Sequence, residues 1–148
     1  AAGDELALTV GVDRPSIAEG DHTASVVVTS AGGGGNATVT ASVERDPVIA
    51  SLARTPPVVT TSTVCGTTLV TVVVNATDES GVDLVEVVWS SDNVFATRTP
   101  LAPSGGSTYM GQVGSFSPAG SRTLTAVVTD TRGNTTQQAT TVTVVACP

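Results

Sequence analysis

The sequence predicts an all-β protein, in which a partial three-stranded β-meander precedes a β-sandwich. Valine and threonine dominate the composition, and their branched side chains suit a pleated sheet better than a helix. Apolar and polar residues alternate with a period of two along most of the chain. Clusters of Gly, Pro, Asp and Asn separate the alternating runs, as turns separate strands.

Residues 1–46 carry three alternating runs and are predicted to form the partial module. The inward-facing sets are Leu6, Leu8, Val10 and Val12, then Ala24, Val26 and Val28, then Val39, Ala41 and Val43. Residues 13–21 and 30–36 are the expected connections, and residues 44–47 are the expected linker, because proline restricts its own backbone and the residue before it. Three strands cannot cover both faces of a core. We therefore expect this module to be covered by the second domain, by another copy of the chain in a homodimer, or by nothing.

Residues 47–148 are predicted to form the sandwich, with about seven strands in about 100 residues. The first strand, over residues 48–52 with Val48, Ala50 and Leu52 inward, is interrupted by a Thr-Pro-Pro sequence. Residues 91–107 are an expected polar connection before a short strand over residues 108–113. The other predicted inward sets are Val70, Val72, Val74 and Ala76; Val85, Val87 and Trp89; Leu124, Ala126 and Val128; and Val142, Val144 and Ala146.

The charge of −7, with no basic run, disfavours nucleic acid and anionic membrane surfaces as partners. No apolar run approaches the roughly 20 residues that span a bilayer, so direct membrane insertion is not expected. An export signal or anchor is expected outside these 148 residues.

The two cysteines, Cys65 and Cys147, bracket the second domain. A disulfide between them would close a long loop and, by restricting the entropy of the unfolded chain, would stabilise the folded state by about 4 kcal/mol. The alternative is two unpaired, small hydrophobic side chains. We favour the disulfide, because the chain has the character of an exported protein.

Two Thr-Asp-x-x-Gly motifs follow valine-rich runs, at Asp78 and at Asp130. Asp at the first position and Gly at the fourth are typical of a type I turn, in which the carboxylate accepts hydrogen bonds from backbone amides. The alternative is a weak calcium site built from Asp78, Glu79 and Asp83, with Asp46 at the linker. The ligand count is short, so no metal and no other cofactor is predicted.

No catalytic residue is predicted. The one histidine, His22, has no accompanying nucleophile elbow, and no helix follows residues 32–35 to bind a phosphate. Asn-x-Thr sequences, the acceptor pattern for N-glycosylation, occur at Asn36, Asn75 and Asn134. We attribute them to the high threonine content of the chain and do not predict glycosylation there. Exposed aromatic residues on a rigid scaffold often anchor a partner, which makes Phe95, Arg98, Tyr109 and Met110 the candidate partner-binding residues. The alternative is that the aromatic residues complete a small core.

Residues 47–148 resemble bacterial immunoglobulin-like domains of actinobacterial envelope proteins. The resemblance lies in the proline-broken first strand, the Val-x-Val-x-Ala-Thr-Asp-x-Ser-Gly-Val motif, the strand that ends in Trp89, and the Val-Val-Thr-Asp-x-x-Gly-Asn motif before the last strand. The cysteines depart from the antibody pattern, because Cys147 follows the final strand. Residues 3–46 are similar to the last three strands of BACON-like modules.

The resemblance implies a non-catalytic extracytoplasmic module that acts as a spacer, interaction or sensing ectodomain of an exported or membrane-anchored protein, such as an envelope-linked regulator. Its expected partner is another protein or a cell-envelope component. Two alternatives remain open. A carbohydrate-binding accessory domain of a secreted hydrolase requires two or more of Trp89, Phe95, Tyr109 and Phe116 on one open face. A calcium-rigidified adhesin repeat requires ion-dependent stability.

Overall fold

The computed structural model describes residues 9–30, 32–92 and 94–148, which belong to two units, Ala1–Glu44 and Arg45–Pro148. The division lies two residues before the predicted joint at 46/47. No helix in the described ranges is long and apolar enough to cross a membrane.

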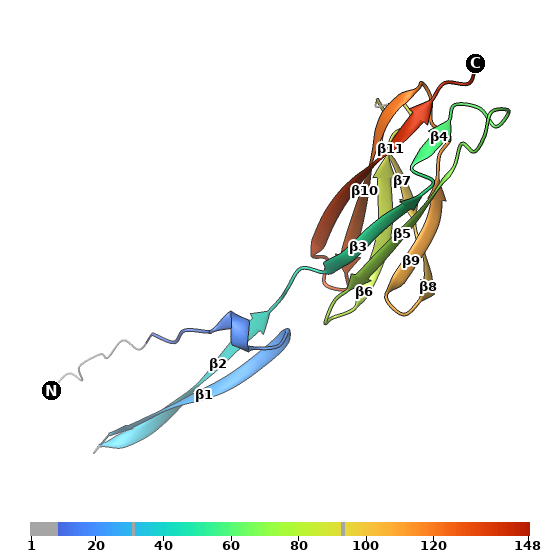
Figure 1. Cartoon of the computed structure of the whole chain (residues 1–148). Helices are drawn as coiled ribbons and strands as arrows, with labels where there is room; N and C mark the ends of the chain where they lie inside the picture. Colours follow the sequence, from blue (N-terminus) through green and yellow to red (C-terminus); the bar gives the residue numbers. More distant parts are fainter. Residues whose placement is uncertain (1–8, 31, 93) are drawn as a thin grey trace. The chain divides into compact units, whose positions relative to one another are not determined.

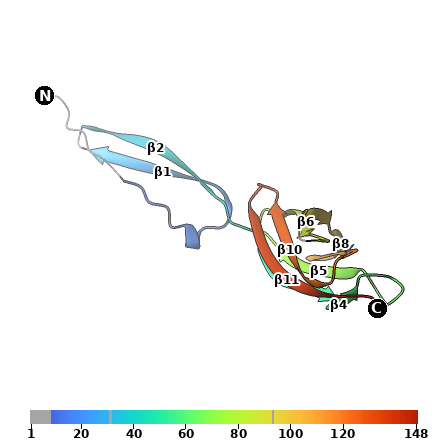
Figure 2. The same ribbon diagram turned by 90° about the horizontal axis from the view of Figure 1, so that it is seen from above.

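The first unit is a long antiparallel hairpin (Figures 1 and 2). A short 3-10 helix, η1 (Arg14–Ser16), precedes strands β1 (Gly20–Ser30) and β2 (Gly33–Val43). Ala24 pairs with Val39, and Val26 pairs with Ala37, so the predicted apolar sets of the two strands share one face. The opposite face carries mainly Thr and Ser.

The prediction of a three-stranded meander is corrected for the described part of this unit, which contains two strands. Leu6 and Leu8 lie outside the described residues, whereas Val10 and Val12 lie in a non-strand segment and are nearly half exposed. The predicted loop at 30–36 is also shorter than expected. Residues 33–36 continue β2, because the glycines pair with residues 28–30 across the hairpin.

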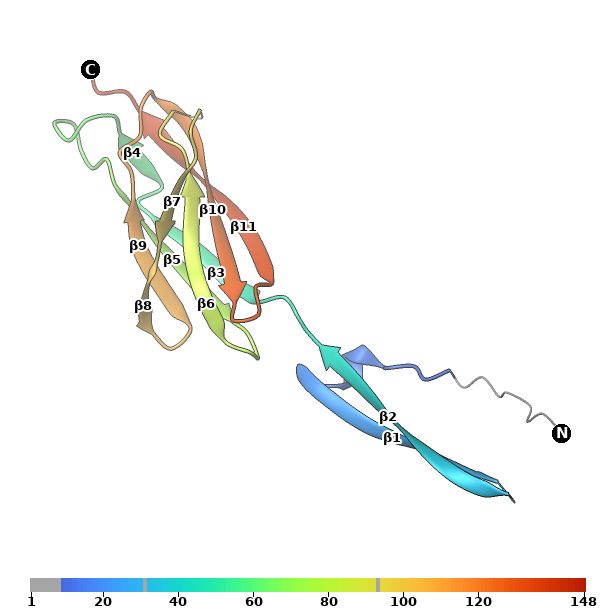
Figure 3. The ribbon, with the colours of Figure 1, turned by 180° about the vertical axis from the view of Figure 1, so that it is seen from behind.

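The second unit is a β-sandwich, which confirms the predicted fold class (Figures 1 and 3). One sheet has the order β4-β11-β10-β6-β7 and the other has the order β3-β5-β9-β8. All neighbours are antiparallel except β4 and β11, which are parallel. The strands are β3 (Val48–Thr55), β4 (Val58–Thr60), β5 (Val70–Thr77), β6 (Val82–Trp89), β7 (Thr97–Pro100), β8 (Ala102–Gly105), β9 (Thr108–Val113), β10 (Gly120–Asp130) and β11 (Thr135–Val145).

The core lies between these two sheets and is built mainly from alternate residues of β5, β6, β10 and β11. Its buried members are Val59, Val70, Val72, Val74, Ala76, Val85, Val87, Trp89, Leu101, Val113, Phe116, Leu124, Ala126, Val128, Val142 and Val144. The predicted inward faces of these four strands are therefore confirmed, except that Ala146 is exposed beyond the end of β11. Trp89 contacts Phe116 edge to face, with ring centroids 5.1 Å apart, and its indole N–H donates to Thr99 Oγ1 at 2.9 Å.

The face of β3 and the strand count are both corrected. The pairing of β3 with β5 shifts between Ile49 and Ser51, so Ala50 is an extra residue in a β-bulge. The bulge reverses the alternation before it, and Ile49 packs on the core while Val48 is 58% exposed. Strands β7 and β8 occupy the passage 91–107, which was predicted to be a connection.

Candidate functional site

The first acidic motif forms the turn between β5 and β6. The Asp78 carboxylate accepts hydrogen bonds from the Ser80 backbone N–H at 2.8 Å and from the Ser80 hydroxyl at 2.6 Å. Gly81 has a φ of 101°, a backbone conformation that glycine adopts without strain. The neighbouring Glu79 forms an ion pair with Arg45 at 2.8 Å. Both of these side chains are about half exposed, so the ion pair adds little stability.

The second acidic motif forms the turn between β10 and β11, and its aspartate is buried. Asp130 Oδ1 accepts hydrogen bonds from the backbone N–H groups of Arg132 and Asn134, both at 2.8 Å, and Oδ2 accepts one from the Asn134 side-chain amide at 2.8 Å. Burial alone would raise the pKa of Asp130, but the hydrogen bonds from Asn134, Arg132 and Gly133 outweigh it, and the pKa is lowered. The carboxylate is therefore stabilised in its ionised form.

The two turns lie side by side at one end of the sandwich. Thr131 donates its backbone N–H to the Gly81 carbonyl and its hydroxyl to the Ser80 carbonyl, both at 3.0 Å. A carboxylate oxygen of Asp78 lies within 4.8 Å of one of Asp130. The repeated motif thus forms a paired corner that links both sheets, a juxtaposition that the separate motifs did not indicate.

Among the described residues, the carboxylates that lie within 4.8 Å of one another at this corner do not include those of Asp46, Glu79 or Asp83. Asp83 is exposed on β6 and Asp46 is exposed in the segment before β3, while Glu79 pairs with Arg45. Calcium takes six to eight oxygen ligands. At both turns, the aspartate carboxylate accepts hydrogen bonds from backbone N–H groups and from one side chain of the same turn.

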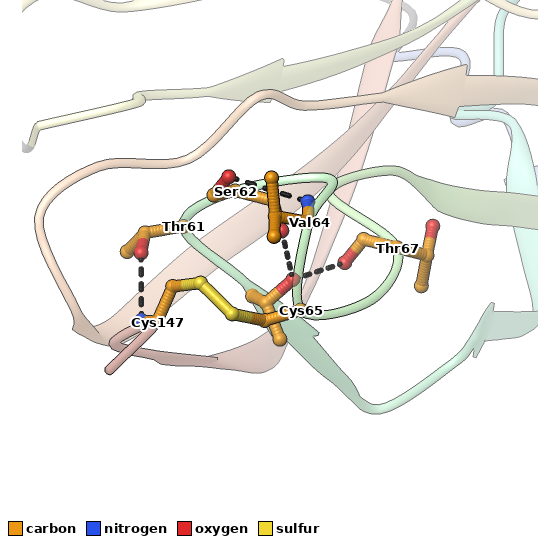
Figure 4. The surroundings of a disulfide bond; sticks show 7 residues. Thr61, Ser62, Val64, Cys65, Thr67 and Cys147 are labelled. Carbon is orange, nitrogen blue, oxygen red and sulfur yellow. Dashed lines mark hydrogen bonds between the residues drawn. A yellow bond between two sulfur atoms is a disulfide. The ribbon is translucent and has the colours of Figure 1, made fainter.

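A disulfide closes the opposite end of the sandwich and confirms the predicted Cys65–Cys147 pair (Figure 4). The two Cα atoms are 5.7 Å apart, and the cysteines are 82 residues apart in the sequence. The backbone N–H of Cys147 donates to Thr61 Oγ1 at 3.1 Å, and the Thr60 hydroxyl contacts the carbonyls of Ser62 and Thr67. The covalent bond therefore joins a hydrogen-bonded loop to the tail that follows β11.

The four candidate partner-binding residues are divided between the two sheets. Phe95 is 77% exposed in the loop before β7, and Arg98 on β7 pairs with Glu86. Tyr109 is half-buried against the core, and the next residue of β9, Met110, is 44% exposed. The structure does not bring the four together into one surface.

Asp92 lies in the segment before β7 and contacts the backbone of that segment. Its carboxylate accepts hydrogen bonds from the N–H groups of Val94 at 2.8 Å and Phe95 at 3.3 Å. The hydrogen bond from Val94 is the main cause of the lowered pKa of Asp92. Trp89 and Phe116 are buried and Tyr109 is half-buried, so Phe95 is the one of the four aromatic residues that is largely exposed.

Sequence reasoning missed the role of Arg122. This side chain is only 4% exposed, and its guanidinium donates to the carbonyls of Ser91 and Ser121, each at 3.0 Å, and also to that of Pro118. It thereby ties the loops that precede β7 and β10 together. A signal was present, because Arg122 is two residues before Leu124 and belongs to the inward-facing series of β10.

The first unit contains an apolar hollow of about 200 Å³ between the segment before β1 and the hairpin. Val10, Val12, Ile17, Ala24, Val39 and Ala41 provide most of its apolar lining. His22 also lines it, and its Nε2 atom lies 2.8 Å from the Ala18 carbonyl. The imidazole is thus engaged with the local backbone.

Neither a protein-family model nor a curated protein matches the chain. The class that the fold and these sites define is an all-β protein whose sandwich is held by paired acidic turns at one end and by a disulfide at the other.

Proposed function

We propose that the chain is a non-catalytic, extracytoplasmic, immunoglobulin-like module of an exported or membrane-anchored bacterial protein. It acts as a spacer, interaction or sensing ectodomain, and its partner is another protein or a component of the cell envelope. The observation that carries this proposal is the Cys65–Cys147 disulfide on a β-sandwich.

The disulfide supports the proposed location because such bonds persist in oxidising compartments and are rare in the cytosol. Cys65 is exposed, so a cytosolic reductant would reach it readily. Oxidised cysteines at this position are therefore expected outside the cytoplasm.

The strand order supports the immunoglobulin-like assignment. The order β3-β5-β9-β8 corresponds to strands A, B, E and D of that fold, and β11-β10-β6 corresponds to G, F and C. Trp89 is the last residue of β6, which corresponds to strand C. It is buried, like the core tryptophan of immunoglobulin-type domains. The disulfide differs from the antibody type, because it joins a loop to the C-terminal tail instead of joining strands B and F.

The acidic turns support a scaffold role. The Asp78 and Asp130 carboxylates accept hydrogen bonds from the residues that follow them, and the two turns brace each other through Thr131. These contacts explain why the motif recurs without requiring a ligand. The resemblance to actinobacterial envelope domains further suggests a place in an envelope-linked regulator or a similar surface protein.

The test uses cells that produce the parent protein. Intact cells are treated with an external protease, and thiols are trapped with maleimide in acid-quenched cells before mass analysis of the peptides that contain Cys65 and Cys147. We expect surface cleavage and no alkylation of either cysteine. Protection from protease until lysis, together with two alkylated thiols, would reject the proposed location.

A further inference from the structure

The disulfide divides the second unit into two parts that respond differently to tension. Residues 65–147 form a covalently closed loop, whereas residues 45–64 lie outside it. A load applied between Arg45 and Pro148 enters the closed loop at Cys147 and leaves it at Cys65. The strands inside the loop are therefore bypassed by the covalent bond.

The closed loop contains almost all of the core. Of the buried hydrophobic cluster, Val59 is the one member that lies outside residues 65–147. The segment outside the loop also contributes the half-buried Ile49 and Leu52. Detaching this segment would expose few core side chains compared with unfolding the whole sandwich.

We propose that the second unit is an extensible linker under tension, in which β3 and β4 detach while the disulfide retains residues 65–147 as a closed body. This inference rests on the proposed function, because a spacer or ectodomain outside the cytoplasm is where a module carries mechanical load. The released segment is a fixed reserve of length. The twenty residues 45–64 reach at most about 70 Å when fully extended.

The segment is held by contacts that resist load along the strands. Seven residues of β3 are paired with β5, and three residues of β4 are paired with β11. Sheet hydrogen bonds lie across the strands, so a pull along the strand axis loads several of them together. The N–H groups of Thr143 and Thr61 add bonds to the carbonyls of Pro57 and Val145, both at 3.0 Å.

The positions of the two ends of the second unit direct the load along its strands. The chain enters β3 at the end of the sandwich opposite to the C-terminus (Figure 1). A pull on the two ends of this unit therefore runs roughly along its strands. The detachment of β3 and β4 should appear as one resolvable event with a defined force.

Single-molecule force spectroscopy of the oxidised whole chain, with handles fused to both ends, tests this inference. We expect one event from the second unit that adds no more than about 70 Å, and a separate contribution of at most about 155 Å from residues 1–44. The Cys65→Ser/Cys147→Ser variant should gain about 290 Å of additional extension, because 82 further residues become free. An oxidised chain that releases those 82 residues would overturn the proposal, as would one that shows no short event before the handles fail.

A matched pair of substitutions in β4 keeps the test independent of the cysteine variant. Val59 is 1% exposed and Val58 is 48% exposed on the same strand. We expect Val59→Ala to lower the force of the short event in the oxidised chain, and Val58→Ala to leave it nearly unchanged. Equal forces in the two variants would contradict the assignment of that event to β4.

The force measurement and the test of cellular location can contradict their respective proposals independently of each other. The force experiment uses purified oxidised protein, so its outcome does not depend on where the cell places the chain. A short event of the expected length in a protein that proves to be cytoplasmic would reject the proposed function and leave the mechanical division intact.

Discussion

Truncation of Leu124 to alanine is expected to destabilise the sandwich by about 3 kcal/mol. Leu124 is fully buried on β10 opposite Trp89 of β6. Three buried carbon atoms are removed, at about 0.8 kcal/mol each, and the cavity left behind adds to that loss. Measured Leu→Ala changes in cores span about 2.7–5 kcal/mol.

The assay is chemical or thermal unfolding followed by the fluorescence of Trp89. This residue is the one tryptophan of the chain and lies in the second unit, so the signal reports that unit alone. A loss of about 3 kcal/mol corresponds to a decrease in Tm of at least about 12 °C for a domain of this size. The matched control is Leu84→Ala on β6, where the leucine is 39% exposed and the expected loss is below about 1 kcal/mol. Equal losses for both variants would refute the alternation argument that places Leu124 in the core.

Three further predictions concern the Cys65–Cys147 disulfide, the turn at Asp130 and Gly114. Replacing Cys65 and Cys147 together with alanine should lower the free energy of unfolding by about 4 kcal/mol, measured in guanidinium chloride, and an unchanged midpoint would contradict the loop-entropy estimate. The folded-state pKa of Asp130 lies below its ordinary value of 3.8, so its contribution to stability is complete above that value and is lost as the pH falls through the lower folded pKa. The free energy of unfolding should therefore decrease less on acidification in Asp130→Asn than in the wild type. Identical pH profiles for the two proteins would contradict this contribution of Asp130. Gly114→Ala should strongly destabilise the sandwich in a thermal melt, because the added Cβ would lie 2.3 Å from the Thr68 carbonyl oxygen, and a wild-type Tm would contradict that clash.

The strands whose side chains strictly alternate could be predicted from the sequence. In β5, for example, Val70, Val72 and Val74 are all buried, because an uninterrupted strand places every second side chain on one face. The bulge at Ala50 broke this rule in β3, because an extra residue in the ladder reverses the inward face and leaves no mark in the hydrophobic pattern.

The short strands β7 and β8 could not be predicted from alternation. Their residues are mostly exposed, and they include Pro100 and Pro103, which favour a connection in a local view. Pairing with neighbouring strands, such as Val87 with Thr99, makes them strands, and that pairing depends on the assembled sheets.

The features of the candidate sites were also predictable only where they depend on local sequence or on a single possible pairing. The disulfide could be predicted because two cysteines allow one intramolecular pair. The turn chemistry of Asp78 and Asp130 could be predicted from local sequence. Their proximity could not, because it depends on β6 and β10 being neighbours in one sheet.

We propose that the turn aspartates hold the chain's own turns and bind no ion. NMR titration of the oxidised protein with calcium tests it most directly, by following the backbone amide signals of Ser80, Arg132 and Asn134, which donate to the two carboxylates. These signals are expected to stay in place up to millimolar calcium, while exposed acidic positions change only weakly and without saturation. Saturable shifts of these three amides together would contradict the claim and make the corner a metal site.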